Sequence, residues 1–103
     1  MPRPATTALI WTAAARADLI RLRRFIEPHD PEAAWRAAQA VKEGAKLLLT
    51  YPAIGKRVEE REDRDLLIPF GQRGYVLRYR LEAQTVVVLR VWHGLEERTT
   101  PEN

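Results

Sequence analysis

Residues 75–93 read YVLRYRLEAQTVVVLRVWH, and this stretch decides the fold. Two runs rich in β-branched, aliphatic and aromatic residues, Tyr75–Leu81 and Thr85–His93, lie on either side of the short connection Glu82-Ala83-Gln84. Runs of this kind, joined by a connection of hairpin length, are typical of two antiparallel strands. The stretch therefore predicts a β-hairpin late in the chain.

Upstream of the hairpin, the sequence predicts one short strand and then two helices. Ala8–Trp11 is the strand candidate. Over Ala13–Ile26, apolar residues recur every three or four positions, as on one face of a helix, and Thr12 is expected to be its N-cap. A second helix is expected over about Pro31–Thr50, with Asp30 as its N-cap and a proline in the first turn, where no N–H donor is needed. The short break between the two helices predicts a helical hairpin.

Two further strand candidates, Arg57–Glu60 and Asp65–Phe70, complete the predicted order β–α–α–β–β–β. Short connections between the late strands favour antiparallel pairing. We therefore expect an α+β domain in which a helical hairpin packs on one face of a mainly antiparallel twisted sheet. The length of 103 residues fits one domain, residues 1–103, with its core at about residues 8–98.

The composition excludes several kinds of site. There is no cysteine, so disulfides, thiolate metal sites and a cysteine nucleophile are excluded, and with two histidines we expect neither a metal nor a cofactor. The longest apolar run, Val86–Leu89, is far too short to span a membrane, and we expect a cytoplasmic protein with no membrane partner. The net charge is +3, and 14 of the 17 basic residues are arginine, which favours planar contacts to phosphate or carboxylate.

Side chains alternate along a strand, and the two late strands then have one face that is mostly apolar and is expected under the helices. The second face mixes apolar and cationic side chains: Val76, Arg78, Arg80, Val86, Val88, Arg90 and Trp92. Apolar area with arginine anchors is typical of a surface that binds a macromolecular partner. The alternative is that the arginine stems simply lie over the valines.

Ordered pieces of the sequence also resemble a known family. The pieces are Trp11-Thr12, Pro31-Glu32-Ala33-Ala34, Tyr51-Pro52-Ala53-Ile54-Gly55-Lys56-Arg57-Val58, Arg64-Asp65-Leu66, Tyr75–Arg80 and Val91-Trp92-His93-Gly94. Over about residues 8–98 the chain resembles the ParE branch of the RelE/ParE superfamily, the toxins of bacterial type II toxin–antitoxin pairs. The resemblance implies the RelE/ParE toxin fold and a cytoplasmic growth inhibitor. It also implies a cognate antitoxin, ParD-like or another small DNA-binding protein, that neutralises the toxin.

Two mechanisms occur in this superfamily. RelE-like members cleave messenger RNA in the ribosome, using strand lysines, arginines and a C-terminal tyrosine. Here the strand that would carry the lysines reads Leu66-Leu67-Ile68-Pro69-Phe70, Val76 stands where the resemblance places a catalytic arginine, and no tyrosine follows Tyr79. These departures favour the ParE-like mechanism, in which the toxin binds DNA gyrase, over ribosome-dependent RNA cleavage.

The remaining candidate for proton transfer is His93, at the end of the last predicted strand. If it acted on RNA, Arg64, Arg78 and Arg80 would be the phosphate clamps. For a binding mechanism, the expected contacts to an acidic target or to antitoxin carboxylates are Arg57, Arg64, Arg78, Arg80 and Arg90, with Val88 and Trp92 as the apolar anchor. A small nucleic-acid-binding module is a further alternative, although aromatic stacking pairs and a helix-turn-helix pattern are missing from the sequence.

Overall fold

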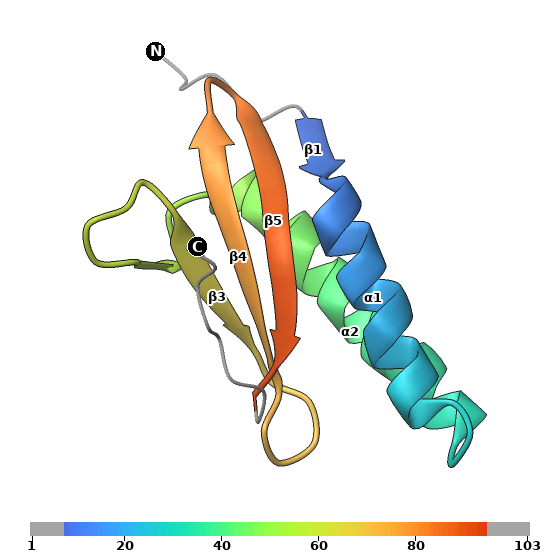
Figure 1. Ribbon diagram of the computed structural model, residues 1–103. Helices are drawn as coiled ribbons and strands as arrows, with labels where there is room; N and C mark the ends of the chain where they lie inside the picture. The colour runs from blue at the N-terminus through green and yellow to red at the C-terminus, as the bar shows by residue number, and fades with distance from the viewer. Residues whose placement is uncertain (1–7, 95–103) are drawn as a thin grey trace.

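The computed structural model describes residues 8–94, which form a five-stranded sheet and two helices (Figure 1). In chain order the elements are β1 (Ala8–Trp11), α1 (Ala13–Ile26), α2 (Pro31–Thr50), β2 (Lys56–Arg57), β3 (Arg64–Ile68), β4 (Tyr75–Glu82) and β5 (Thr85–His93). The strands lie side by side in the order β1-β5-β4-β3-β2; β1 is parallel to β5, and the other neighbours are antiparallel. The predicted α+β class is confirmed, while the expected core boundary near residue 98 lies outside the described residues.

Both helices begin where their capping residues predict. The Thr12 hydroxyl accepts a hydrogen bond from the Ala15 N–H at 3.0 Å, and the Asp30 carboxylate accepts one from the Ala33 N–H at 3.0 Å. Each bond satisfies a donor that the first turn of a helix leaves without a partner. The predicted bounds of both helices are confirmed. Within residues 8–94, neither helix combines the length and the apolarity needed to cross a membrane.

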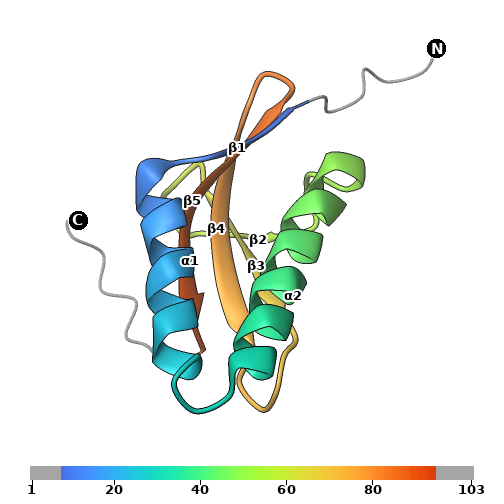
Figure 2. The same ribbon diagram turned by 90° about the vertical axis from the view of Figure 1, so that its right-hand side faces the viewer.

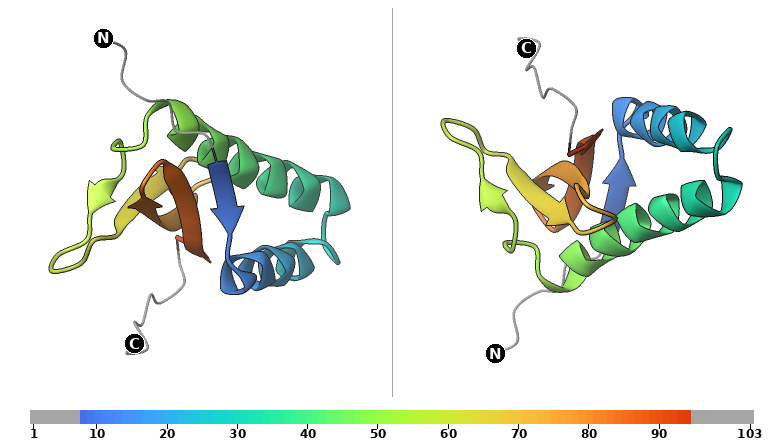
Figure 3. Two further views of the ribbon diagram at one scale, coloured as in Figure 1. Left: turned by 90° about the horizontal axis from the view of Figure 1, so that it is seen from above. Right: turned by 90° about the horizontal axis from the view of Figure 1, so that it is seen from below.

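The two helices cover the same face of the sheet (Figures 2 and 3). α1 lies along β5, and α2 packs against the β3 side of the sheet, where Gly44 allows a close approach. A Cβ atom at that position would come within 2.8 Å of the Ile68 side chain. The core between the layers includes Leu22, Val41, Leu48, Ile68, Leu77, Tyr79, Val86, Val88 and Val91. The opposite face of the sheet, turned away from the helices, is called the outer face below.

One extra residue in β5 changes which side chains point to the helices. The β4–β5 register shifts between Arg78 and Tyr79, and Leu89 is the extra residue. A β-bulge of this kind interrupts the strict alternation of faces. Val86 and Val88 consequently lie in the core under the helices. The prediction that these two valines belong to the outer face is wrong, because simple alternation along the strand does not include the bulge.

The predicted strand Arg57–Glu60 is mostly a turn. β2 ends at Arg57, and Glu60 adopts a positive φ of 63°, a left-handed conformation that no strand can include. The Val58 N–H then donates to the carbonyl oxygen of Asp63 at 3.0 Å, which closes the turn before β3. The predicted strand was therefore wrong beyond Arg57. Residues 59–63 are all charged, and charged residues do not favour a strand over a tight turn.

Candidate functional site

The centre of the outer face is Trp92, which two arginines cover. Trp92 is the cross-strand neighbour of Val76, and it is only 7% exposed. The guanidinium carbons of Arg78 and Arg90 lie 5.1 and 5.4 Å from the centre of its ring, within the range of cation–π attraction. Trp92 is therefore on the predicted face, but the two arginines leave it little exposed surface for a partner. Arginine side chains lying over apolar residues describe this part of the face better.

Carboxylates of the same chain hold these two arginines. Arg78 donates from Nε and Nη2 to the two oxygens of Asp65 at 2.8 and 3.1 Å. Arg90 donates from Nε and Nη2 to the two oxygens of Asp18 at 2.7 and 3.1 Å. Both are bidentate, charge-assisted pairs, and the bond to Asp65 is the main cause of the raised pKa of Arg78. Both guanidinium groups thus pair with this chain's own carboxylates.

Asp18 also joins α1 to the backbone of β5. It is 3% exposed, and its Oδ2 accepts a hydrogen bond from the Val91 N–H at 2.8 Å. Arg21 donates to the Val91 carbonyl at 3.3 Å, and the Thr12 hydroxyl donates to the Leu89 carbonyl at 3.0 Å. These bonds provide partners for backbone N–H and C=O groups of β5 beyond Val88, the last residue of β5 that pairs with β1. Side chains of α1 and its cap therefore replace a neighbouring strand along this stretch.

Arg64 and Arg80 are also held by groups of the same chain. Arg64 donates from Nη1 to the carbonyl oxygens of Ala53 and Gly55 at 3.2 and 2.8 Å, and thereby supports the turn after α2. Arg80 donates from Nε to the buried carboxylate of Asp63 at 3.0 Å, and this bond is the main cause of its raised pKa. These contacts show structural roles that their position in the sequence did not reveal.

His93 faces the helices and lies apart from the predicted phosphate clamps. It is the cross-strand partner of Tyr75, and the two rings meet edge to face with their centroids 5.5 Å apart. Tyr75 points into the core, whereas Arg78 and Arg80 project from the other face of the same strand. The sheet itself therefore separates His93 from these two arginines. His93, Arg78 and Arg80, which were expected to act together in RNA cleavage, are therefore not brought together at one point.

The accessible part of the outer face lies toward β2. Arg57 is exposed there, while Val88 has no exposed surface and cannot contribute to this part of the face. Leu67, which the sequence did not single out, is exposed on the neighbouring strand. Arg57, Leu67 and Lys56 line a depression of about 320 Å³, and Asp65, which is paired with Arg78, also lines it. An apolar residue beside two cations remains open to a partner at this end of the face.

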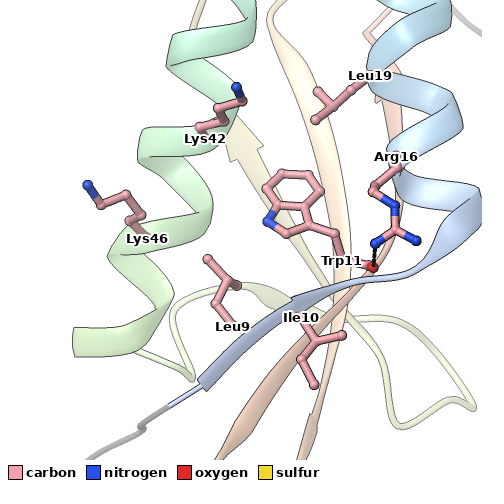
Figure 4. Close-up of a pocket in the computed structure, with 7 residues that line it drawn as sticks. All are labelled: Leu9, Ile10, Trp11, Arg16, Leu19, Lys42 and Lys46. Atoms are coloured by element: carbon pink, nitrogen blue, oxygen red, sulfur yellow. Dashed lines mark hydrogen bonds between the residues drawn. The ribbon is translucent and has the colours of Figure 1, made fainter.

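A larger cleft, called the first cleft below, lies between β1 and the two helices (Figure 4). Its volume is about 670 Å³, and it is lined by Leu9, Ile10, Trp11, Arg16, Leu19, Lys42 and Lys46. Figure 4 shows the Trp11 indole between the helices, with cationic side chains from both helices at the margins. No pattern in the sequence pointed to this site. The feature of the sequence that could have indicated it is the pair Lys42 and Lys46, one helical turn apart beside the apolar stripe of α2. That these lysines approach β1 depends on the tertiary fold.

The first cleft follows the outer edge of β1, which is the end strand of the sheet formed by residues 8–94. Leu9 and Trp11 pack toward the core, Ile10 points to the other face, and all three line the cleft. An end strand can pair with an added extended segment, while apolar surface and cations next to it select the side chains. The arrangement fits a polypeptide with apolar and acidic residues. No group of His, Cys, Asp or Glu within the described part of the chain is arranged to hold a metal.

The sequence matches the family model for the ParE toxin of the type II toxin–antitoxin system parDE over residues 9–98. It is 38% identical over 93 residues to Toxin RelE1 of Caulobacter vibrioides, an alignment that spans 90% of this chain and 99% of that protein. It is also 39% identical over 84 residues to Toxin RelE3 of the same organism, spanning 82% and 90% of the two chains.

Two solved structures have the same fold. A chain of the chromosomal ParDE toxin–antitoxin system from P. aeruginosa superposes with a TM-score of 0.73 at 24% identity, over 85% of this chain and 96% of that one. A chain of the toxin–antitoxin complex RelBE2 from Mycobacterium tuberculosis superposes with a TM-score of 0.60 at 32% identity, over 88% and 99% of the two chains. The sequence and structural similarities therefore agree with each other.

Proposed function

The chain belongs to the ParE toxin family of type II toxin–antitoxin systems, and from this premise we propose that it arrests growth in the cytoplasm by binding DNA gyrase. The observation that carries the proposal is the placement of His93 on one face of the sheet and of Arg78 and Arg80 on the other. Cleavage of RNA needs proton transfer and stabilisation of the phosphate charge at one point. Because the sheet lies between them, His93 cannot act together with Arg78 and Arg80 on one phosphate.

Within this proposal, the toxin contacts its target through the accessible end of the outer face, near β2. Arg57 and Lys56 supply charge there, and Leu67 supplies apolar area. Arg78 and Arg90 contribute indirectly, because they hold Trp92 and the strands beneath this surface in place.

We assign the first cleft to a cognate antitoxin that neutralises the toxin. Its apolar floor and its three cations at the margin, Arg16, Lys42 and Lys46, complement a segment with apolar and acidic side chains. The RelBE2 structure, which shares this fold, is itself a toxin–antitoxin complex. The antitoxin and the target thus use separate surfaces, so a variant at one surface can leave the other intact.

Replacing His93 with alanine is expected to change growth inhibition less than threefold. The reason is that a binding mechanism uses no proton transfer at this position, and His93 packs against Tyr75 at the end of β5. The measurement is the growth rate of cells that express equal amounts of the wild-type chain or the variant. Thermal unfolding of both purified proteins is the control for folding. A well-folded variant that has lost all toxicity would support acid–base chemistry, and thus ribosome-dependent RNA cleavage.

A further inference from the structure

A second cleft lies on the opposite flank of α1 from the first. Its volume is about 540 Å³, and it is lined by Arg21, Leu22, Arg24, Phe25, Ile26, Tyr75 and His93. It opens where the second half of α1 lies beside the end of β5 (Figure 1). Leu19 lines the first cleft and Leu22 lines the second, so the two clefts meet α1 within about one helical turn of each other.

The solvent side of α1, which separates the two clefts, is apolar and cationic. Phe25 is 79% exposed and Ile20 is 52% exposed, an arrangement that a helix facing only water does not favour. Asp18 is the only acidic residue within the helix, and it is buried against Arg90. A partner that crossed α1 would therefore meet apolar surface and arginines along its whole path.

We propose that the antitoxin binds both clefts at once, with one segment crossing α1 and placing apolar and acidic side chains in the second cleft. The inference rests on the proposed function, because it extends the antitoxin site from the first cleft. An α-helix is about 10 Å across, so about four extended residues suffice for the crossing. In the second cleft, Leu22 and Tyr75 supply an apolar floor, and Arg24 supplies charge for a carboxylate.

A second copy of this chain fits the same surface poorly. Two α1 helices brought together at Phe25 would oppose Arg21, Arg23 and Arg24 of one copy to the same arginines of the other. Like charges placed together at an interface cost several kcal/mol. Opposite charge removes this penalty, which is why an acidic partner is the occupant that the surface favours.

Two linked contacts also affect the affinity of the toxin for its antitoxin. Once a segment occupies one cleft, binding at the other becomes intramolecular, at an effective concentration in the millimolar range for a short connection. Losing either contact therefore weakens the complex without abolishing it. The second cleft is expected to act mainly on the dissociation rate, since the first contact is enough to bring the two proteins together.

The test is the double variant Arg24→Glu/Phe25→Ser, in which both residues are exposed and neither is needed for the core. The matched control is Arg36→Glu/Leu47→Ser, which alters an exposed arginine and an exposed apolar residue of α2 that line neither cleft. We expect the co-encoded antitoxin to dissociate 10- to 100-fold faster from the first variant and at the wild-type rate from the control. In the wild-type complex, hydrogen exchange should slow at residues 20–26 as well as at residues 9–11.

Unchanged dissociation from the Arg24→Glu/Phe25→Ser variant, with exchange slowed only around the first cleft, would overturn the bipartite site. The same conclusion would follow if the variant altered self-association of the chain and left antitoxin binding as it was. Failure of the proposed antitoxin site gives a different result, because exchange in the wild-type complex would then not slow around the first cleft. Failure of the proposed gyrase target is distinguishable too, because it would leave binding of the cognate antitoxin unchanged.

Discussion

Replacing Asp18 with alanine is expected to lower the free energy of unfolding by about 3–5 kcal/mol, because it leaves a buried backbone donor unpaired and removes charge-assisted hydrogen bonds from two arginines. The Asp18 carboxylate accepts hydrogen bonds from Arg90, Arg21 and the N–H of Val91. Without it, a buried backbone donor has no acceptor, and α1 loses a charged link to β5. A domain of this size has a total stability of about 5–15 kcal/mol, so a large part of it would be lost.

Urea unfolding followed by circular dichroism measures this effect. Asp18→Asn keeps a side-chain oxygen for the Val91 N–H and should lose less stability than Asp18→Ala. Arg23→Ala is the control, because Arg23 meets Glu27 at 3.7 Å with both side chains about half exposed. An exposed pair of this kind contributes about 0.3–0.5 kcal/mol. A loss below about 1 kcal/mol for Asp18→Ala would mean that packing alone holds α1 on the sheet.

Reversing two charges of the first cleft, with Lys42→Glu/Lys46→Glu, is expected to raise the Kd for the antitoxin at least 100-fold. Both lysines are exposed on α2, and a carboxylate at either position would repel an acidic segment. The expected change corresponds to about 2.7 kcal/mol of binding free energy. Much of the increase in Kd should come from a slower association rate. High salt should reduce this difference between the variant and the wild type, because it screens the charges that steer association.

Titration calorimetry gives the Kd, and growth assays show its consequence. Cells expressing this variant should stop growing even when the antitoxin is present, because the target surface on the outer face is unchanged. The control is Arg36→Glu/Arg73→Glu, which makes the same change of net charge at two exposed positions away from the cleft. Equal loss of antitoxin binding in both double variants would show a general effect of charge and would remove the first cleft from the account.

The order of the elements follows from local patterns, and those patterns were sufficient. Thr12 and Asp30 as caps, the apolar stripes of both helices and the hairpin connection near Ala83 predict the α+β fold, and the structure confirms it. The bulge at Leu89 was not predictable from alternation, because one unpaired residue leaves no mark in a run of valines and leucines. This single residue moved Val88 from the predicted binding face into the core.

The candidate site shows the same division between local and tertiary information. Sequence placed arginines on the outer face, and Arg78 and Arg90 are there. Their partners, Asp65 and Asp18, lie 13 and 72 positions away in the chain, so their internal roles depended on the fold. The first cleft joins residues from β1, α1 and α2, which no local pattern connects. Composition could suggest that arginines bind acids, but only the structure shows which acids are within the chain itself.

The most direct measurement compares two activities of the same purified chain. DNA supercoiling by gyrase is followed alongside cleavage of messenger RNA on programmed ribosomes, each with and without the antitoxin. We expect the toxin to block supercoiling, the antitoxin to restore it, and the messenger RNA to stay intact throughout. Cut messenger RNA together with fully active gyrase would overturn the proposal, because cleavage of RNA, and not binding to gyrase, would then be the activity of this chain.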